Sequence, residues 1–477
     1  MTSDGEHPNV GAGLSANHDQ GWSAIRKLAQ RYQNGDGVET DLNKAFQLFM
    51  EAVSSGDVEA MVGVGLCYDY GKGVAQDKRE AFEWYMKAAN NGSARGMRDV
   101  GICFANGEGV AQDDAVAFEW FLKSAESGDP PAMESVGVCY DDGRGVTQDK
   151  AKAFEWYLKA ANYGEANAMY NVGVSYSIGE GVEQDRAKAF EWYLKAANNG
   201  SARAMFNLGM SYAKGKGVKQ NPCKAFDWYF KAANCGIVKA MVALGCCYDD
   251  GSGVVEDKTK AFKWFMKAAE GGDVTAMGVI GGCYYDGMMV PKDLTKAFGW
   301  FVKAAENGYV KVMNSVGMCY KKGEGVAQDK KKGFEWSLKA AQKGNIDGIL
   351  SVGVSYYNGE GVAQDSAKAF EWWSKGAEVG SNGAMYAVGI CYDEGEGVAQ
   401  DKRKAFEWYL KAAEGGHIHA MNKVGLCYKN GDGVPQDMAK AFEWHLKAAQ
   451  NGDATAMESV DWCYDKGDGV EQVQSFS

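Results

Sequence analysis

The sequence predicts an all-α solenoid of twelve 36-residue helix-turn-helix repeats that ends in a half-repeat. Three observations support this prediction: a fixed period, two helical patterns in each period, and a glycine-rich turn between them. A period of about 20–50 residues is typical of solenoids, in which each unit buries its apolar face only by stacking on its neighbours. The period is marked by a phenylalanine that recurs every 36 residues without insertion or deletion, at Phe46, Phe82, Phe118, Phe154, Phe190, Phe226, Phe262, Phe298, Phe334, Phe370, Phe406 and Phe442.

The first helix of each repeat, helix A, shows a 3.6-residue periodicity. In repeat two, Met61, Val64 and Tyr68 lie on one helical face, at i, i+3 and i+7. The position of Tyr68 is aromatic in all thirteen copies of the helix. Gly65, at i+4, costs a helix about 1 kcal/mol relative to alanine. The recurrence of this glycine therefore predicts a close approach between two helix backbones.

A Gly-x-Gly-Val turn follows helix A. Gly71 suits the left-handed residue that ends a helix, and every copy of the repeat keeps it. Asp77 is aspartate or asparagine in every repeat, which fits an N-cap that accepts hydrogen bonds from the free amides of the next helix. Repeat eight carries Met289 where the second glycine stands elsewhere, so we expect its turn to differ.

The second helix of each repeat, helix B, is apolar around most of its circumference. Such a helix is expected to be buried between its neighbours. In repeat two this leaves mainly Glu83 and Lys87 for solvent, and Gly92 ends the helix. Its apolar residues are Ala81, Phe82, Trp84, Tyr85, Met86, Ala88 and Ala89.

The repeats predict three segments. Residues 1–20 are polar and glycine-rich, which is typical of a disordered tail. Residues 21–470 form the repeat array, and residues 471–477 form a short C-terminal tail. The last helix A carries Asp461 where eleven other repeats have glycine, which suits a terminal helix that shields its neighbour from water.

Composition excludes several classes of function. A formal net charge of −12 argues against a nucleic-acid-binding surface, which needs a basic stripe, and against anionic membranes. No apolar run approaches the roughly 20 residues of a membrane span, so we expect no membrane insertion. The first 20 residues lack the pattern of a secretory signal, and we therefore expect a cytoplasmic protein.

The cysteines form a ladder rather than a disulfide framework. Packed helices lie about 8–10 Å apart, whereas a disulfide needs Cα atoms within about 4.4–6.8 Å. Equivalent thiols in successive repeats are thus too far apart to pair, and we expect reduced, buried, small apolar side chains. Nine of the twelve cysteines share one repeat position: Cys67, Cys103, Cys139, Cys247, Cys283, Cys319, Cys391, Cys427 and Cys463.

These motifs resemble the Sel-one-like repeat family, which is related to the tetratricopeptide repeats. The matching features are Leu/Val-Gly-x-x-Tyr in helix A, the Gly-x-Gly-Val turn, and Asp-x-x-Lys-Ala-x-x-Trp-Tyr-x-Lys-Ala-Ala in helix B. The resemblance covers about residues 21–470. It implies a right-handed α/α superhelix with helix A on the concave side, and a role as a protein-interaction scaffold or adaptor.

One branch of the family suggests an alternative. It is secreted, bridges two cysteines per repeat, and includes members that resemble penicillin-binding enzymes. In this chain those two positions hold residues such as Ala89 and Met97, which argues against the disulfide and hydrolase interpretations. An enzyme or thiol-reactive protein on the same repeats stays as the alternative to a non-enzymatic scaffold.

No residue pattern predicts a catalytic, cofactor or metal site. The Gly-x-Gly turns follow a helix, whereas a dinucleotide-binding loop follows a strand. We interpret His417, His419 and His445 as surface polar residues rather than metal ligands. Cys235 lies close in sequence to the Cys246–Cys247 pair, so a reactive thiol there is a further hypothesis.

The variable positions of helix A predict where a partner binds. Positions equivalent to 62, 63, 66 and 70 of repeat two lie opposite its core face and match the ligand-contacting positions of tetratricopeptide repeats. Aromatic and asparagine side chains on such a face suit recognition of a neutral or basic peptide segment. The alternatives are that these residues pack internally, or that the array is a plain spacer. The candidate groove residues are Tyr170, Asn171, Val174, Ile178, Phe206, Asn207 and Met210.

Overall fold

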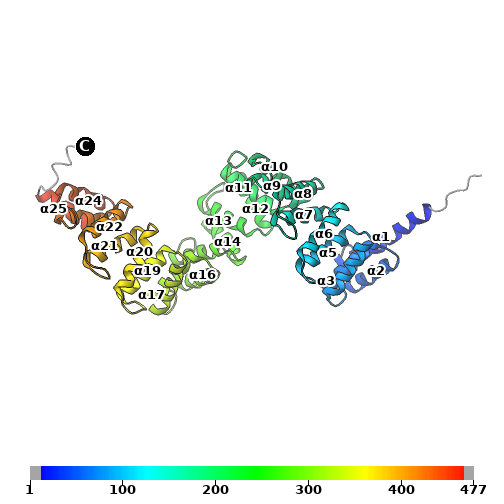
Figure 1. Ribbon diagram of the computed structural model, residues 1–477, viewed down its shortest axis with the longest axis horizontal. Helices are drawn as coiled ribbons and strands as arrows, with labels where there is room; N and C mark the ends of the chain where they lie inside the picture. Colours follow the sequence, from blue (N-terminus) through cyan, green and yellow to red (C-terminus); the bar gives the residue numbers. More distant parts are fainter. Residues whose placement is uncertain (1–11, 467–477) are drawn as a thin grey trace, which may run out of the picture. The chain divides into compact units, whose positions relative to one another are not determined.

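The computed structural model describes residues 12–466, and every regular element in that range is an α-helix (Figure 1). The helices are α1 (Ala12–Asn34), α2 (Leu42–Ser54), α3 (Val58–Tyr70), α4 (Lys78–Asn90), α5 (Ala94–Asn106), α6 (Asp114–Glu126), α7 (Pro130–Asp142), α8 (Lys150–Asn162), α9 (Ala166–Ile178), α10 (Arg186–Asn198), α11 (Ala202–Lys214), α12 (Pro222–Asn234), α13 (Val238–Asp250), α14 (Lys258–Glu270), α15 (Val274–Asp286), α16 (Leu294–Glu306), α17 (Val310–Lys322), α18 (Lys330–Gln342), α19 (Ile346–Asn358), α20 (Ser366–Glu378), α21 (Asn382–Glu394), α22 (Lys402–Glu414), α23 (Ile418–Asn430), α24 (Met438–Gln450) and α25 (Ala454–Lys466).

The predicted all-α repeat is confirmed. Odd-numbered helices are the A helices and even-numbered helices are the B helices, and α25 is the expected half-repeat. The chain forms two compact units, one with α1–α12 and one with α14–α25, and α13 spans their boundary. Within each unit, every helix packs against the next helix along the chain.

The structure describes only part of the two segments that were expected to be tails. Helix α1 begins at Ala12, inside the segment 1–20 that was expected to be a tail. Residues 1–11 and the C-terminal tail over 471–477 lie outside the described residues.

The recurrent glycine of helix A makes room for an aromatic ring and, in several repeats, also for the backbone of helix B. A Cβ atom on Gly65 would lie 2.5 Å from Cε1 of Tyr85 on α4. In repeat four, a Cβ on Gly137 would lie 2.6 Å from the ring of Tyr157 on α8. The predicted close approach of two backbones is present in several repeats, since a Cβ on Gly101 or Gly137 would also lie 3.2 or 3.3 Å from a carbonyl oxygen of helix B, but the ring of helix B is the nearer contact.

Both glycines of the turn adopt the left-handed conformation. Gly71 has φ 66° and ends α3, as predicted, with its N–H donating to Cys67 O. Gly73 has φ 76°, and a Cβ there would lie 2.0 Å from Leu42 O at the start of α2 in the preceding repeat. The second glycine thus lets the turn lie against the preceding repeat, which no larger residue could do without displacement.

The predicted N-caps are confirmed. Asp77 is extended, with φ −147°, and its carboxylate accepts hydrogen bonds from the N–H groups of Arg79 (2.9 Å) and Glu80 (3.1 Å). N-cap aspartates start other B helices too, for example Asp149 and Asp437, whose carboxylates accept from the N–H groups of Lys152 and Lys440.

Neighbouring repeats are joined by aromatic contacts. The ring of Phe82 on α4 meets the ring of Phe104 on α5 edge-on, with centroids 5.5 Å apart. The outer side of helix B carries a second recurring pair, in which the Lys87 ammonium lies 4.0 Å from the Trp84 ring centroid. Glu83 and Lys87 are exposed, as expected, whereas Phe82 and Trp84 are half-buried.

The turn of repeat eight keeps the left-handed backbone of the other turns at Met289 but differs in its hydrogen bonds, as expected: among the described residues it lacks the bond that the turn of repeat two makes from Lys72 N to Cys67 O, at 2.9 Å. Met289 occupies the position of the second glycine with φ 65°, in the left-handed region. Its thioether sulfur lies 3.7 Å from the Sγ of Cys283, which donates to it. The fold of the repeat thus imposes a backbone conformation that an L-residue adopts only at a cost of about 1–2 kcal/mol.

The nine ladder cysteines are buried, which confirms the interpretation of them as small core residues. Burial raises the pKa of Cys67 to about 11 and the pKa of Cys391 to about 12. Cys223, Cys235 and Cys246 are exposed.

Among the helices in the described part of the chain, none is both long and apolar enough to cross a membrane.

Replacing Met289 by glycine should stabilise repeat eight by about 1 kcal/mol, because the left-handed conformation costs glycine nothing sterically. Urea denaturation, together with hydrogen exchange of the amides in α15 and α16, measures the effect. Met288→Gly in the same turn is the control: Met288 is exposed and does not have a positive φ, so it should not stabilise. Equal stabilisation by both variants would contradict the strain at Met289.

Brief alkylation of the native protein with iodoacetamide should modify the three exposed cysteines and spare the nine ladder cysteines. Cys246 should react more slowly than Cys223 and Cys235, because burial and the carboxylates of Asp250 and Asp249 raise its pKa. Peptide mass spectrometry before and after denaturation measures the pattern. Rapid native labelling of ladder cysteines would contradict their burial.

Candidate functional site

The predicted groove residues lie at equivalent positions of two successive A helices in the first unit. Tyr170, Asn171, Val174 and Ile178 are on α9, and Phe206, Asn207 and Met210 are on α11. Ile178 is 53% exposed, and the other six are half-buried. We call the side of α5, α7, α9 and α11 that carries these repeat positions the A-helix face.

The two aromatic residues rest on the tyrosines of the B helices. The ring centroids of Tyr170 and Tyr193 are 5.9 Å apart, and those of Phe206 and Tyr229 are 5.8 Å apart. Each ring therefore packs on one side against the core and leaves its other side partly open. In repeat two the equivalent Val62 is fully buried, so this position faces the surface only in some repeats.

The asparagines are partly engaged within the protein. The amide of Asn171 donates to Oε1 of Glu134 on α7, at 3.4 Å. Asn207 and Ser177 both hydrogen bond to the hydroxyl of Tyr193. Burial, reinforced by the charge of Glu165, raises the pKa of Glu134. The Asn171–Glu134 contact links the candidate residues of α9 to the preceding A helix, α7.

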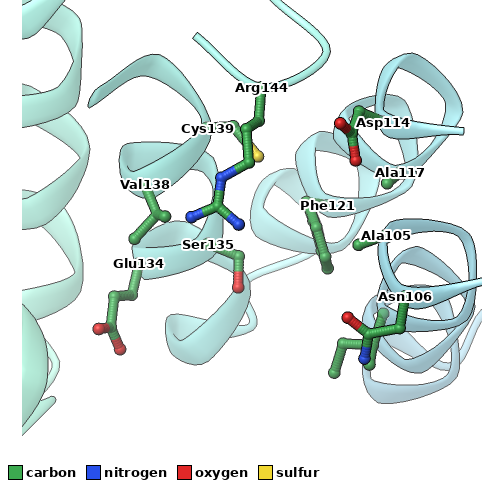
Figure 2. A pocket seen from close by; sticks show the side chains of 11 residues that line it. Ala105, Asn106, Asp114, Ala117, Phe121, Glu134, Ser135, Val138, Cys139 and Arg144 are labelled. Carbon is green, nitrogen blue, oxygen red and sulfur yellow. The ribbon is translucent and has the colours of Figure 1, made fainter. Parts of the chain in front are cut away.

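A pocket on α5, α6 and α7 adjoins this patch through Glu134. Its empty volume is about 790 Å³ including the space open to solvent, and Figure 2 shows residues from all three helices around it. Phe121, Ala105 and Val138 supply apolar surface, while Arg144 and Glu134 supply charge. Arg144 also donates from Nε to a carboxylate oxygen of Asp142, at 3.0 Å.

Sequence reasoning missed this pocket, although the repeat pattern holds a signal for it. In repeats four and eleven a helix-B tyrosine donates to a helix-A aspartate: Tyr157 to Asp141 at 3.4 Å, and Tyr409 to Asp393 at 3.2 Å. Repeat three has Phe121 and Ala105 at those two positions. The loss of both the hydroxyl and the carboxylate leaves the space that forms the pocket.

The three histidines of the second unit have different environments. His417 stacks on Tyr386, with ring centroids 4.6 Å apart, and His419 Nδ1 lies 2.9 Å from Oδ2 of Asp453. His445 is fully buried at the helix-B aromatic position, so the expectation of a surface residue is wrong for it. Among the described residues, no group of three His, Cys, Asp or Glu side chains could hold a metal ion.

His445 is held in its neutral form. Its Nδ1 hydrogen bonds to Oδ1 of Asn422 at 2.8 Å, while its buried Nε2 has no hydrogen-bond partner among the described residues. Burial, with a smaller effect from the charge of Lys429, lowers the pKa of His445 from 6.5 to about 4.

The stability of repeat twelve should therefore fall as the pH drops from 6.5 towards 4. The unfolded chain takes up a proton at His445 in this window and the folded chain does not, so protonation favours unfolding. His445→Tyr, which restores the common aromatic residue, should remove this part of the pH dependence. Urea denaturation with hydrogen exchange of α23 and α24 across this pH range measures it. An unchanged pH dependence in the variant would contradict the role of His445.

Comparison with known proteins identifies the repeat. The Sel1 repeat family model matches twelve segments, at residues 22–57, 58–93, 94–129, 130–164, 166–201, 202–237, 238–273, 275–309, 310–345, 347–381, 383–417 and 418–453. No curated protein matches the chain.

Two solved structures are similar over much of the chain. One is c5321, a protective antigen present in uropathogenic Escherichia coli strains that displays an SLR fold. It is 31% identical, with a TM-score of 0.76, and the match covers 90% of this chain and 92% of that one. The other is a Sel1 repeat protein from Oxalobacter formigenes, which is 31% identical, with a TM-score of 0.49 over 63% of this chain and 87% of that one. Because the family model matches nearly the whole helical array, this chain belongs to the Sel1 repeat family.

Proposed function

We propose that the chain is a non-enzymatic interaction scaffold that binds a segment of a partner protein along the A-helix face of the first unit. One observation carries this proposal. Tyr170 and Phe206 occupy equivalent positions in adjacent repeats, and each ring packs on a tyrosine of helix B and is only half-buried. Supported but accessible aromatic rings are typical of residues that dominate binding energy at interfaces.

The spacing of the two rings suits an extended peptide. Equivalent side chains on successive A helices are about 10 Å apart. Side chains three residues apart on an extended segment of polyproline II conformation, with three residues per turn and a rise of about 3.1 Å per residue, lie on one side and span about the same distance. The Oδ1 atoms of Asn171 and Asn207 could accept main-chain N–H groups between the two anchors.

The pocket beside Phe121 extends this surface by two repeats. Its apolar wall of Phe121, Ala105 and Val138 suits an aliphatic side chain of the same partner segment. Glu134 lies between the pocket and the aromatic patch, and the chain has a formal net charge of −12. A neutral or basic segment is therefore the better match for the aromatic patch.

The alternative of a thiol-reactive protein has less support. Reactive cysteines need a lowered thiol pKa. Burial and the carboxylate of Asp250 instead raise the pKa of Cys247 to about 11, and the same two causes raise the pKa of Cys246. The proposal accordingly assigns no catalytic role to any residue.

A peptide selected from a random library on the immobilised protein should lose at least about tenfold in affinity when Tyr170 and Phe206 are both replaced by alanine, since hot-spot truncations cost about 2 kcal/mol or more. Isothermal titration calorimetry measures the affinity. Leu158→Ala with Leu194→Ala is the matched control, because these two apolar residues lie on the B helices of repeats four and five and are half-buried or exposed. It should leave binding intact.

The thermal melts of both double variants need to stay comparable, so that loss of binding reports the surface rather than unfolding. If the Tyr170/Phe206 variant binds the selected peptides as wild type does, the A-helix face is not the binding site. If it loses stability far beyond the control variant, the two rings are core residues and the proposal fails.

A further inference from the structure

The pocket beside Phe121 has apolar walls that a ligand can reach. Ile102 on α5 and Val138 on α7 line the pocket and occupy the same repeat position on successive A helices. Ile102 is 38% exposed and Val138 is half-buried. Phe121 itself is only 6% exposed. The accessible apolar surface therefore comes mainly from the two A helices.

The charged groups at this pocket are mostly acidic. Asp114 on α6 and Glu134 on α7 line it, and Arg144 is the one cation among the described residues that do so. Arg144 donates to the carboxylate of Asp142, from Nε at 3.0 Å and also from Nη2. Asp114 and Glu134 form no ion pair within the described part of the chain. One guanidinium thus faces three carboxylates, so two negative charges are left over wherever Arg144 pairs.

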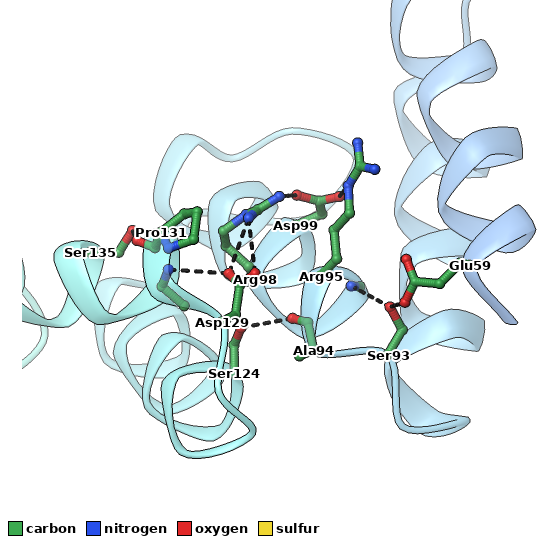
Figure 3. Close-up of polar contacts among 12 residues, drawn as sticks. Glu59, Ser93, Ala94, Arg95, Arg98, Asp99, Ser124, Asp129, Pro131 and Ser135 are labelled. Atoms are coloured by element: carbon green, nitrogen blue, oxygen red, sulfur yellow. Dashed lines mark hydrogen bonds and ion pairs between the residues drawn. The ribbon is translucent and has the colours of Figure 1, made fainter. Parts of the chain in front are cut away.

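Neighbouring cations do not cancel this excess at Glu134. Arg98 has the equivalent position on the preceding A helix, but it donates to both oxygens of Asp129, at 3.3 and 3.0 Å (Figure 3). Burial raises the pKa of Glu134, and the charge of Glu165 raises it further by more than that of Arg203 lowers it. A cation bound beside Glu134 would therefore relieve an uncompensated charge.

The polar side chains of the pocket suit a donor with an apolar stem. The hydroxyl of Ser135 donates to the main-chain oxygen of Pro131 at 3.1 Å (Figure 3), so its own oxygen can accept a hydrogen bond. Figure 2 shows the carboxylates of Asp114 and Glu134 on opposite sides of Phe121. A lysine ammonium has three N–H donors and no acceptor, on a flexible chain of methylenes. It matches acceptors on separate side chains better than a planar guanidinium, which favours the two oxygens of one carboxylate.

We propose that this pocket binds a lysine side chain of the partner segment. Its methylene stem lies between Ile102 and Val138, and its ammonium donates to Glu134 and Ser135, while Asp114 adds to the negative potential. This inference rests on the proposed function, in which a partner segment lies along the A-helix face, and it adds the residue type that the pocket selects.

The repeat also sets the place of the lysine in the segment. Glu134 and Tyr170 occupy equivalent positions on α7 and α9, about 10 Å apart. In polyproline II conformation this distance corresponds to about three residues. The lysine should therefore lie three residues before or after the apolar residue that packs on Tyr170.

Fluorescence anisotropy with two labelled peptides tests the proposal: Lys-Pro-Ala-Leu-Pro-Ala-Leu and its reverse, Leu-Ala-Pro-Leu-Ala-Pro-Lys. Both are needed because the repeat spacing fits either chain direction, and at least one should bind the wild-type protein. Norleucine in place of the lysine keeps the stem and removes the ammonium. This change should weaken binding at least about tenfold, because it removes charge-assisted hydrogen bonds. Arginine in its place should weaken binding several-fold.

Asp114→Asn with Glu134→Gln removes both charges and keeps the shapes of the side chains. This variant should bind the lysine peptide at least about tenfold more weakly and the norleucine peptide unchanged. Glu191→Gln with Asp227→Asn is the matched control, because it removes the same two charges from exposed positions on α10 and α12 of the same unit. It should leave both affinities unchanged, and thermal melts verify that all variants fold.

Tyr170→Ala with Phe206→Ala separates this inference from the proposed function. It should weaken the lysine and norleucine peptides equally, because it removes apolar contacts only. No effect of this variant on either peptide, with the Asp114/Glu134 effect present, would contradict the aromatic patch and leave the lysine pocket supported.

Other results would overturn the lysine pocket and leave the aromatic patch to its own test. These are no binding of either lysine peptide, equal binding of the lysine and norleucine peptides, equal losses for both peptides in the Asp114/Glu134 variant, or an equal loss in the matched control. Tighter binding of the arginine peptide would also overturn it. So would displacement of the peptide by spermidine at a lower concentration than by unlabelled peptide, since the site would then belong to a free polyamine.

Discussion

Most repeats depend on one contact, in which a ring of helix B lies against a glycine of helix A. Any Cβ at that glycine would come within about 2.5–2.7 Å of the ring in repeats two to eight. The contact sets how closely the two helices of a repeat approach, and it buries the ring of helix B, as for Tyr85 and Tyr157. Neighbouring repeats then pack on this pair, because each unit buries its apolar side only against the next one.

Repeat nine shows what happens when the ring is absent. It has Ser337 at the ring position and Gly333 where other repeats have alanine. The side chain of Lys321 occupies the space, since a Cβ on Gly333 would lie 2.5 Å from Lys321 Cγ. The ammonium donates to Ser355 Oγ at 2.8 Å, and burial lowers the pKa of Lys321. A lost aromatic volume is thus replaced by a lysine stem whose charged end reaches the polar groups of α19.

The fold could be predicted from the sequence because it is repeated thirteen-fold in helix A. The period, the turn glycines and the N-caps are local sequence features. Because they recur in successive copies, a deviation in one copy does not obscure the pattern. Met289 and His445 could not be predicted in the same way, because each is a single departure whose environment is imposed by the surrounding repeat. Met289 adopts the positive φ that glycine has in the other turns. His445 is buried, as are the aromatic rings at the same position of other repeats.

The candidate sites were harder to predict, because each depends on contacts between residues of different helices. Tyr170 and Phe206 could be found as unusual residues at one repeat position, but their half-burial against Tyr193 and Tyr229 depends on a second helix. The pocket beside Phe121 depends on two coordinated replacements, Phe121 and Ala105, that lie sixteen positions apart in the sequence. Neither replacement is unusual alone.

Charge on the A-helix face follows a further constraint. A buried charge is costly unless it is paired and hydrogen-bonded. Asp99 is only 9% exposed, and burial raises its pKa although Arg98 and Arg95 act in the opposite direction. Arg98 therefore serves to offset Asp99 and Asp129, and its presence at a groove position is no sign of a ligand site. Lys27 and Arg31 are exposed and face no such demand.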